Sequence, residues 1–198
     1  MKTRALTRHE IKQIMDACES LRDKALLAIG FNCGYRITEI LSLKVKDVCS
    51  VRNGKIFIHD VIRVGKDNMK GKKKDRAIRL NSDAKKVLMP FLLSLLKNDL
   101  EGGLDKPLFS GRKHQFKKAI TRQHAWRIIN NLAELALGTN EGIGTHSLRK
   151  SFATHLYFLT NDFHKVSKYL GHAFVITTER YINDELNLSD DLEQLALV

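Results

Sequence analysis

Two stretches near the end of the chain decide how the sequence is interpreted: GTHSLRKSFATHL, residues 144 to 156, and LGHAFVITTERY, residues 170 to 181. They contain four side chains that can bind or attack phosphate: His146, Arg149, His172 and Tyr181. A third stretch far upstream, GYRITE at residues 34 to 39, adds an arginine and a glutamate. These residue types are compatible with chemistry on a phosphodiester, although their spacing in the sequence does not by itself bring them together.

Attack by a tyrosine on a phosphodiester requires these residue types. A neutral tyrosine, with a pKa of about 10, is a poor nucleophile and needs positive charge nearby. Two arginines and a histidine can hold the phosphate oxygens through the transition state without a metal, because the guanidinium fork binds phosphate in a bidentate way. The leaving sugar oxygen needs a proton, which a lysine of lowered pKa on a hairpin can supply. His146 and Arg149 are three residues apart and therefore share a helix face.

The three stretches resemble the sequence boxes of the tyrosine recombinase, or phage integrase, family. Residues 34 to 43, GYRITEILSL, look like the first arginine box. Residues 146 to 154, HSLRKSFAT, look like the His-x-x-Arg box, and residues 170 to 181 look like the Gly-His and nucleophile box. Their order and spacing make the resemblance specific, and it covers the chain from about Leu6 to about Tyr181.

The resemblance implies a role for each residue at a matching position. Tyr181 would be the nucleophile that forms a 3′-phosphotyrosyl bond and releases a 5′-hydroxyl. Arg36 and Arg149 would hold the scissile phosphate, and Glu39 would brace Arg36. The two histidines would assist: His146 in general acid–base chemistry and His172 as a donor to the phosphate.

The lysine of the family's hairpin is harder to place. Lys70 and Gly71, followed by KDRAI at residues 74 to 78, resemble the family pattern with one extra residue. We predict Lys70 as the catalytic lysine, with Lys66 and Lys72 as rivals. Lys150 stands where many members carry a further histidine, and the sequence assigns it no role.

The chain is strongly basic, with a net charge of +12 in 198 residues, which favours a polyanionic partner. The charge is concentrated between Arg63 and Arg76 and between Arg112 and Arg127, whereas residues 183 to 198 hold acids and no base. The lysines and arginines of the two basic segments are predicted to contact backbone phosphates. The predicted DNA contacts are Lys66, Lys72, Lys73, Lys74, Arg76, Lys117, Lys118 and Arg122.

Hydrophobic periodicity predicts an α+β fold that is mainly α-helical, with a small three-stranded antiparallel sheet. Thr7 and Glu10 form a capping-box pattern that opens the first helix, and Gly34 is expected to end the second. Residues 55 to 64 and 77 to 80 are predicted strands, joined by a hairpin at residues 65 to 74. Further helices are predicted at residues 21–31, 36–43, 83–98, 114–137 (one helix or two), 147–159, 162–170, 175–181 and 189–197.

We expect residues 1–182 to form one catalytic domain and residues 183–198 to form an acidic amphipathic tail. Two interpretations of the tail remain open: a helix that closes its own core, or a segment that docks on a neighbouring protomer. The family's N-terminal core-binding domain is not expected in this chain. The chain is then either an excised fragment or similar to the small recombinases that invert fimbrial promoter switches.

The implied enzyme is a site-specific DNA recombinase that needs no cofactor and no metal. Its partner would be double-stranded DNA, bound by a homotetramer on paired sites, with a monomer possible without DNA. Three scattered cysteines and no membrane-spanning run favour a cytoplasmic protein, associated with the nucleoid. Two alternatives stay open: relaxation of DNA by a type IB topoisomerase-like enzyme, and a non-catalytic DNA-binding accessory protein.

Overall fold

The computed structural model describes residues 3–65, 75–111 and 117–186, and the elements below belong to this part of the chain. The helices are α1 (Arg8–Ala17), α2 (Leu21–Cys33), α3 (Ile37–Leu41), α4 (Val45–Val48), α5 (Ser82–Leu96), α6 (Arg122–Leu137), α7 (Thr145–Thr160), α8 (Phe163–Leu170) and α9 (Val175–Leu186). The strands are β1 (Cys49–Arg52), β2 (Lys55–Ile58), β3 (Val61–Val64) and β4 (Arg76–Arg79). The α+β prediction, mainly helical with small antiparallel sheets, is confirmed.

The strand arrangement differs from the prediction. Instead of one three-stranded sheet, β1 pairs with β2 and β3 pairs with β4, both antiparallel. The predicted strand at residues 55 to 64 bends at His59 and Asp60 and so divides into β2 and β3. The missed strand, β1, is joined to β2 by Asn53 and Gly54, which have φ values of 50° and 70°. Two positive φ angles in a two-residue loop are typical of a tight hairpin turn.

Local capping signals placed the first helices correctly. The Thr7 side chain accepts from the backbone N–H of Glu10, and the Glu10 carboxylate accepts from the backbone N–H of Thr7. α2 ends at Gly34, whose φ of 56° lies in the left-handed region that glycine favours. The structure also adds α4 and extends α9 to Leu186.

The helix predicted from residue 114 begins later. Thr121 caps α6 through its side chain, which accepts from the backbone N–H of His124. Just before it, residues 117 and 118 form a bend and Ala119 forms an antiparallel bridge with Ser110, so this segment is not helical. Residues 112–116 and the helix predicted at 189–197 lie outside the described residues.

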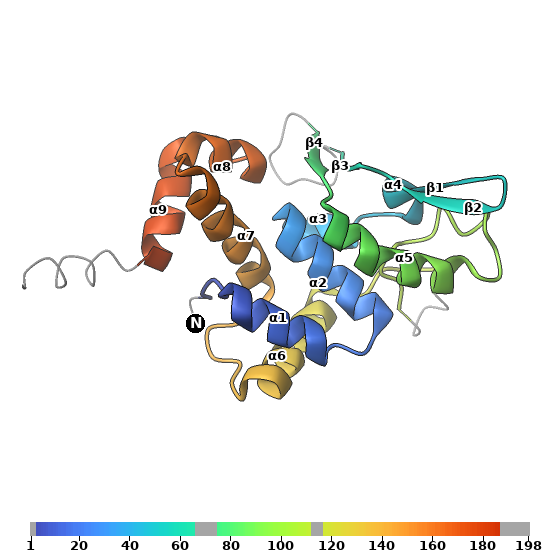
Figure 1. The fold of residues 1–198 in the computed structure, drawn as a ribbon, viewed down its shortest axis with the longest axis horizontal. Helices are drawn as coiled ribbons and strands as arrows, with labels where there is room; N and C mark the ends of the chain where they lie inside the picture. Colours follow the sequence, from blue (N-terminus) through green and yellow to red (C-terminus); the bar gives the residue numbers. More distant parts are fainter. Residues whose placement is uncertain (1–2, 66–74, 112–116, 187–198) are drawn as a thin grey trace, which may run out of the picture.

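The buried apolar side chains form two separate groups. The main core gathers residues from α1 to α6, the β3–β4 pair and the start of α7, and its central members include Leu26, Leu27 and Ile29. The second group, called here the C-terminal cluster, consists of Ala153, Val166, Leu170 and Ile182. Figure 1 shows α7, α8 and α9 together at one end of the molecule, with the β1–β2 hairpin at the opposite end.

Two glycines of α2 let α7 approach the main core closely. A Cβ atom on Gly30 would lie 2.6 Å from Cδ1 of Leu148, and one on Gly34 would lie 2.3 Å from Cδ1 of Phe152. The N-terminal segment also contacts α7, because the backbone N–H of Leu6 donates to Oγ of Ser151 over 2.8 Å. The helix that carries Arg149 is therefore held against the helix that ends beside Arg36.

Candidate active site

Arg36 lies at the N-terminus of α3 and is braced by Glu39. The Glu39 side chain is 1% exposed and accepts from the Arg36 backbone N–H over 2.8 Å and from Arg36 Nη1 over 3.1 Å. The Arg36 side chain remains 37% exposed. A buried carboxylate thus orients an arginine whose outer part is accessible, which is the arrangement expected of a group that binds an external phosphate.

Arg76 shares the same carboxylate but is buried. Its Nη2 lies 2.9 Å from Oε2 of Glu39, its Nη1 donates to the Leu170 carbonyl over 2.8 Å, and its side chain is 8% exposed. Its guanidinium group also lies 4.2 Å from the centroid of the Tyr35 ring. Arg76 is therefore buried, with its Nη donors directed at protein groups inside the molecule, and its contact with DNA stays a prediction.

Arg149 connects the three predicted boxes. Its Nη1 donates to the Gly34 carbonyl over 2.6 Å, its Nη2 donates to the Leu170 carbonyl over 2.8 Å, and Nη2 also lies 3.2 Å from Nε2 of His172. Burial, followed by the nearby cations Arg76 and Arg36, lowers the pKa of Arg149 to about 9. The group therefore stays charged at neutral pH and repels other cations in the site.

His172 and Tyr181 are brought together by the turn between α8 and α9. Gly171 ends α8 with a φ of 65°, and His172 follows it directly. Nδ1 of His172 lies 2.8 Å from the hydroxyl of Thr178, and the His172 ring meets the Tyr181 ring edge-on with 5.9 Å between centroids. The half-buried tyrosine packs against the C-terminal cluster.

His146 lies in the first turn of α7 and is exposed. Partial burial lowers its pKa, and the cations Arg149, Arg36 and Lys150 lower it further. The imidazole is therefore neutral at pH 7 and can accept a proton. The structure thus brings Arg149, His172 and Tyr181 into contact, links Arg36 to them through Glu39, Arg76 and the shared carbonyls, and places His146 within electrostatic range of both arginines.

The remaining predicted residues do not take part in these contacts. Lys117, Lys118 and Arg122 are exposed before and at the start of α6. Lys70, the predicted catalytic lysine, and four predicted DNA contacts lie outside the described residues: Lys66, Lys72, Lys73 and Lys74.

Sequence reasoning missed two contributors to the site. Lys150 is 7% exposed, and its Nζ lies 5.5 Å from the centroid of the Tyr181 ring. Thr178 is fully buried and holds His172. The available signals were the place of Lys150 directly after Arg149, where many family members carry a histidine, and the place of Thr178 inside the nucleophile box.

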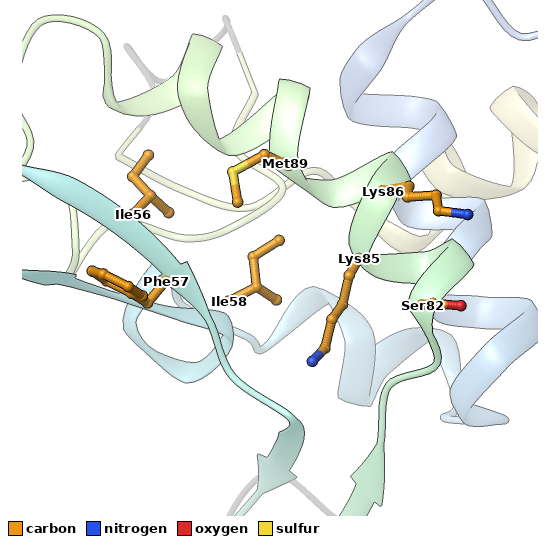
Figure 2. Close-up of a pocket in the computed structure, with 7 residues that line it drawn as sticks. All are labelled: Ile56, Phe57, Ile58, Ser82, Lys85, Lys86 and Met89. Carbon is orange, nitrogen blue, oxygen red and sulfur yellow. The ribbon is translucent and has the colours of Figure 1, made fainter.

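A separate apolar pocket of about 520 Å³ lies between β2 and α5 (Figure 2). Its lining contains Ile56, Ile58 and Met89 with Lys85 nearby, and none of the predicted catalytic residues. Within the described ranges, no group of three or more metal-ligating side chains is close enough to hold an ion. No helix in those ranges is long and apolar enough to cross a membrane.

Known proteins share both the sequence pattern and the fold. Tyrosine recombinase XerC of Herpetosiphon aurantiacus is 34% identical over 163 residues, which cover 82% of this chain and 48% of that protein. The crystal structure of XerA recombinase matches with a TM-score of 0.73 and 23% identity, over 98% of this chain and 66% of that one. XerH site-specific recombinase bound to difH substrate matches with a TM-score of 0.70 and 26% identity, over 100% and 55% of the two chains.

These relatives are longer than the chain, which spans about half the length of the XerC protein. A model of the phage integrase family matches residues 4–187, nearly the whole sequence. The matched region includes all three boxes that converge on Arg149. The chain therefore belongs to the phage integrase family.

Proposed function

We propose that this chain is the catalytic part of a site-specific DNA recombinase that cleaves and rejoins DNA through Tyr181. One observation carries the proposal: Arg149 donates to the carbonyls of Gly34 and Leu170 and so joins the three boxes into one cationic site beside a tyrosine. Membership of the phage integrase family and the likeness to XerC support it.

In the cleavage step, the Tyr181 oxygen attacks the scissile phosphorus and a new O–P bond forms. The bond between phosphorus and the 5′-oxygen breaks, and a 3′-phosphotyrosyl link remains on the enzyme. Arg36 and Arg149 hold the non-bridging oxygens, and His172 donates to them, so the developing negative charge meets preorganised donors. The strand is rejoined when a 5′-hydroxyl attacks the phosphotyrosine, which needs no external energy source.

Two protons move in this step. The Tyr181 phenol loses one, and His146 in its neutral form can accept it. The departing 5′-oxygen gains one, which we assign to Lys70 in the segment between β3 and β4. β4 begins at Arg76, which is anchored to Glu39 and Leu170.

The bound substrate is proposed to be double-stranded DNA. The net charge of +12 favours a polyanion, and the exposed side chains of Lys117, Lys118 and Arg122 can contact backbone phosphate. We assign residues 1–182 to the catalytic domain and residues 183–198 to the acidic tail, which either closes the core of its own chain or docks on a neighbouring protomer. Four protomers on paired sites, acting on the nucleoid in the cytoplasm, would complete the reaction.

Covalent trapping tests the proposal. The protein is incubated with nicked duplexes from its own genomic neighbourhood. After cleavage, the nick lets the short fragment that carries the 5′-hydroxyl dissociate, which prevents rejoining. After denaturation, the wild type is expected to show a protein–DNA adduct on a gel. Tyr181→Phe should show no adduct while DNA binding stays nearly unchanged. Tyr169→Phe, which alters an exposed tyrosine, is the matched control and should keep the adduct.

The same assay separates the two alternatives. A type IB topoisomerase-like enzyme would form the adduct on any duplex and relax any supercoiled plasmid, whereas a recombinase needs particular paired sites. A non-catalytic accessory protein would bind DNA without an adduct on any sequence. An adduct that persists in Tyr181→Phe would contradict the assignment of the nucleophile.

A further inference from the structure

Lys150 occupies a position that the proposed mechanism does not use. It follows Arg149 on α7 and is 7% exposed, although lysine is rarely buried to this degree. Its Nζ lies 5.5 Å from the centroid of the Tyr181 ring. An ammonium group is therefore held against the ring of the proposed nucleophile.

Charged and titratable groups reach Tyr181 from the elements packed against α9. Arg149 and Lys150 face it from α7, and Arg149 interacts electrostatically with Tyr181. His172 faces it from the turn after α8, with 5.9 Å between the ring centroids. The other titratable side chains described on α8 and α9 are His164, Lys165, Lys168, Tyr169, Glu179 and Arg180.

We propose that Lys150 is a positioning residue for the nucleophile, which holds the Tyr181 ring and favours its phenolate form. This inference rests on the proposed function of Tyr181. A cation over an aromatic face is attracted to the ring. When the phenol ionises, the negative charge spreads into that ring and the attraction grows, so the ammonium group favours the ionised form.

The same ammonium group also acts on His146. Lys150 is one of the cations that lower the pKa of His146, after burial and the two arginines of the site. The neutral imidazole is the form that accepts a proton. Lys150 thus keeps the histidine neutral before the attack, ready to take the Tyr181 proton, and its charge stabilises the phenolate that forms as this proton leaves.

A purely structural role for Lys150 makes a different prediction. The aliphatic part of a buried lysine can stabilise a fold by packing alone, and here it would do so between α7 and the C-terminal cluster. Removing the charge while keeping the stem would then leave the titration of Tyr181 unchanged. Replacing the charge with another cation would likewise have no specific effect on that titration.

The titration of Tyr181 distinguishes the two roles without any DNA. The four tyrosines are replaced by 3-fluorotyrosine and followed by ¹⁹F NMR, because ring fluorination brings the phenol titration to lower pH. Tyr181→Phe identifies the Tyr181 resonance. Lys150→Met, which keeps the stem and removes the charge, is expected to raise the pKa of Tyr181 by about one unit or more. Lys150→Arg should keep it near the wild-type value.

An unchanged Tyr181 pKa in a folded Lys150→Met protein would overturn the proposal. Folding is checked by thermal unfolding and by the resonances of the other three tyrosines. If the methionine variant does not fold, Lys150→Gln replaces it in the same comparison. In the trapping assay, a shift of one unit should slow adduct formation at pH 7 about tenfold, with recovery at higher pH. If the wild-type protein forms no adduct at all, the proposed function is contradicted, whereas the effect of Lys150 on the Tyr181 titration can still be measured.

Discussion

The two ends of the candidate site rest on very different amounts of buried structure. Arg36 and Glu39 are held by α3, whose Ile40 belongs to the main core that spans α1 to α6. His172 and Tyr181 are held by α8 and α9, which share only the small C-terminal cluster of Ala153, Val166, Leu170 and Ile182. Because local stability follows buried apolar contact, the phosphate-binding end is expected to be the more rigid of the two.

Arg149 and Arg76 join these unequal regions. Both donate to the carbonyls of Gly34, at the end of α2, and of Leu170, at the end of α8. The position of the nucleophile relative to Arg36 therefore depends on buried hydrogen bonds as well as on the apolar packing of α7 against α2. The comparison predicts that replacing a polar residue at this junction lowers the cleavage rate most. Replacing an apolar residue should lower the stability of the region in which it is buried.

The largest effect is expected from Arg149→Ala. It removes a donor to the transition state, which costs about 10²–10³-fold in the cleavage rate. It also removes hydrogen bonds to two buried carbonyls that keep Arg76 as a donor, so each lost bond is expected to cost about 0.5–1.5 kcal/mol of stability. Single-turnover cleavage of a nicked substrate and urea unfolding measure the two losses. Arg149→Lys keeps the charge and loses the paired donors of the guanidinium group. It should recover part of the lost stability and a smaller part of the lost cleavage rate.

A matched pair of isoleucines compares the two regions directly. Ile29 and Ile182 are both 0% exposed, one in the main core and one in the C-terminal cluster. Ile29→Ala should lower the global free energy of unfolding by about 2–5 kcal/mol. Ile182→Ala should cost less globally and should increase amide hydrogen exchange in α8 and α9 selectively. Equal global losses, with exchange unchanged in α8 and α9, would show that the two regions unfold as one unit.

The smallest effect concerns the N-terminal segment that contacts α7. The Arg4 side chain, followed by the capping contacts with Thr7, lowers the pKa of Glu10 to about 2 from its ordinary 4.5. A carboxyl whose pKa is lower in the folded state contributes stability above pH 4.5, and this contribution is lost as the pH falls towards 2. Since the Arg4 side chain is 42% exposed, solvent screening limits the contribution to about 1 kcal/mol.

Glu10→Gln tests this contribution. At pH 7 the variant should be about 1 kcal/mol less stable than the wild type. The difference should disappear as the pH falls from 4.5 towards 2, because the unfolded carboxyl gains a proton in this range while the folded one, with a pKa of about 2, still holds its charge. Urea unfolding across this pH range measures it. A difference that stays constant down to pH 2 would mean that the substitution acts through packing or the helix cap and not through the charge.

Local patterns were enough to predict much of the secondary structure. Thr7 with Glu10 placed the start of α1, and Gly34 placed the end of α2, because capping depends on neighbouring residues only. The division of residues 55 to 64 into two strands could not be predicted from local patterns. Residues 55 to 64 look like one β-branched run, and the bend at His59 and Asp60 arises because β2 pairs with β1 while β3 pairs with β4.

The sequence by itself determined the family, through three boxes whose residue types and spacing match a phosphoryl-transfer chemistry, and it determined the candidate nucleophile. Only the tertiary structure decided which basic residues face outward. Arg76 lies in a basic segment, yet its donors turn inward to Glu39 and Leu170, and Lys150 packs against Tyr181. Burial depends on contacts between segments far apart in the chain, whereas charge and spacing are properties of the chain alone.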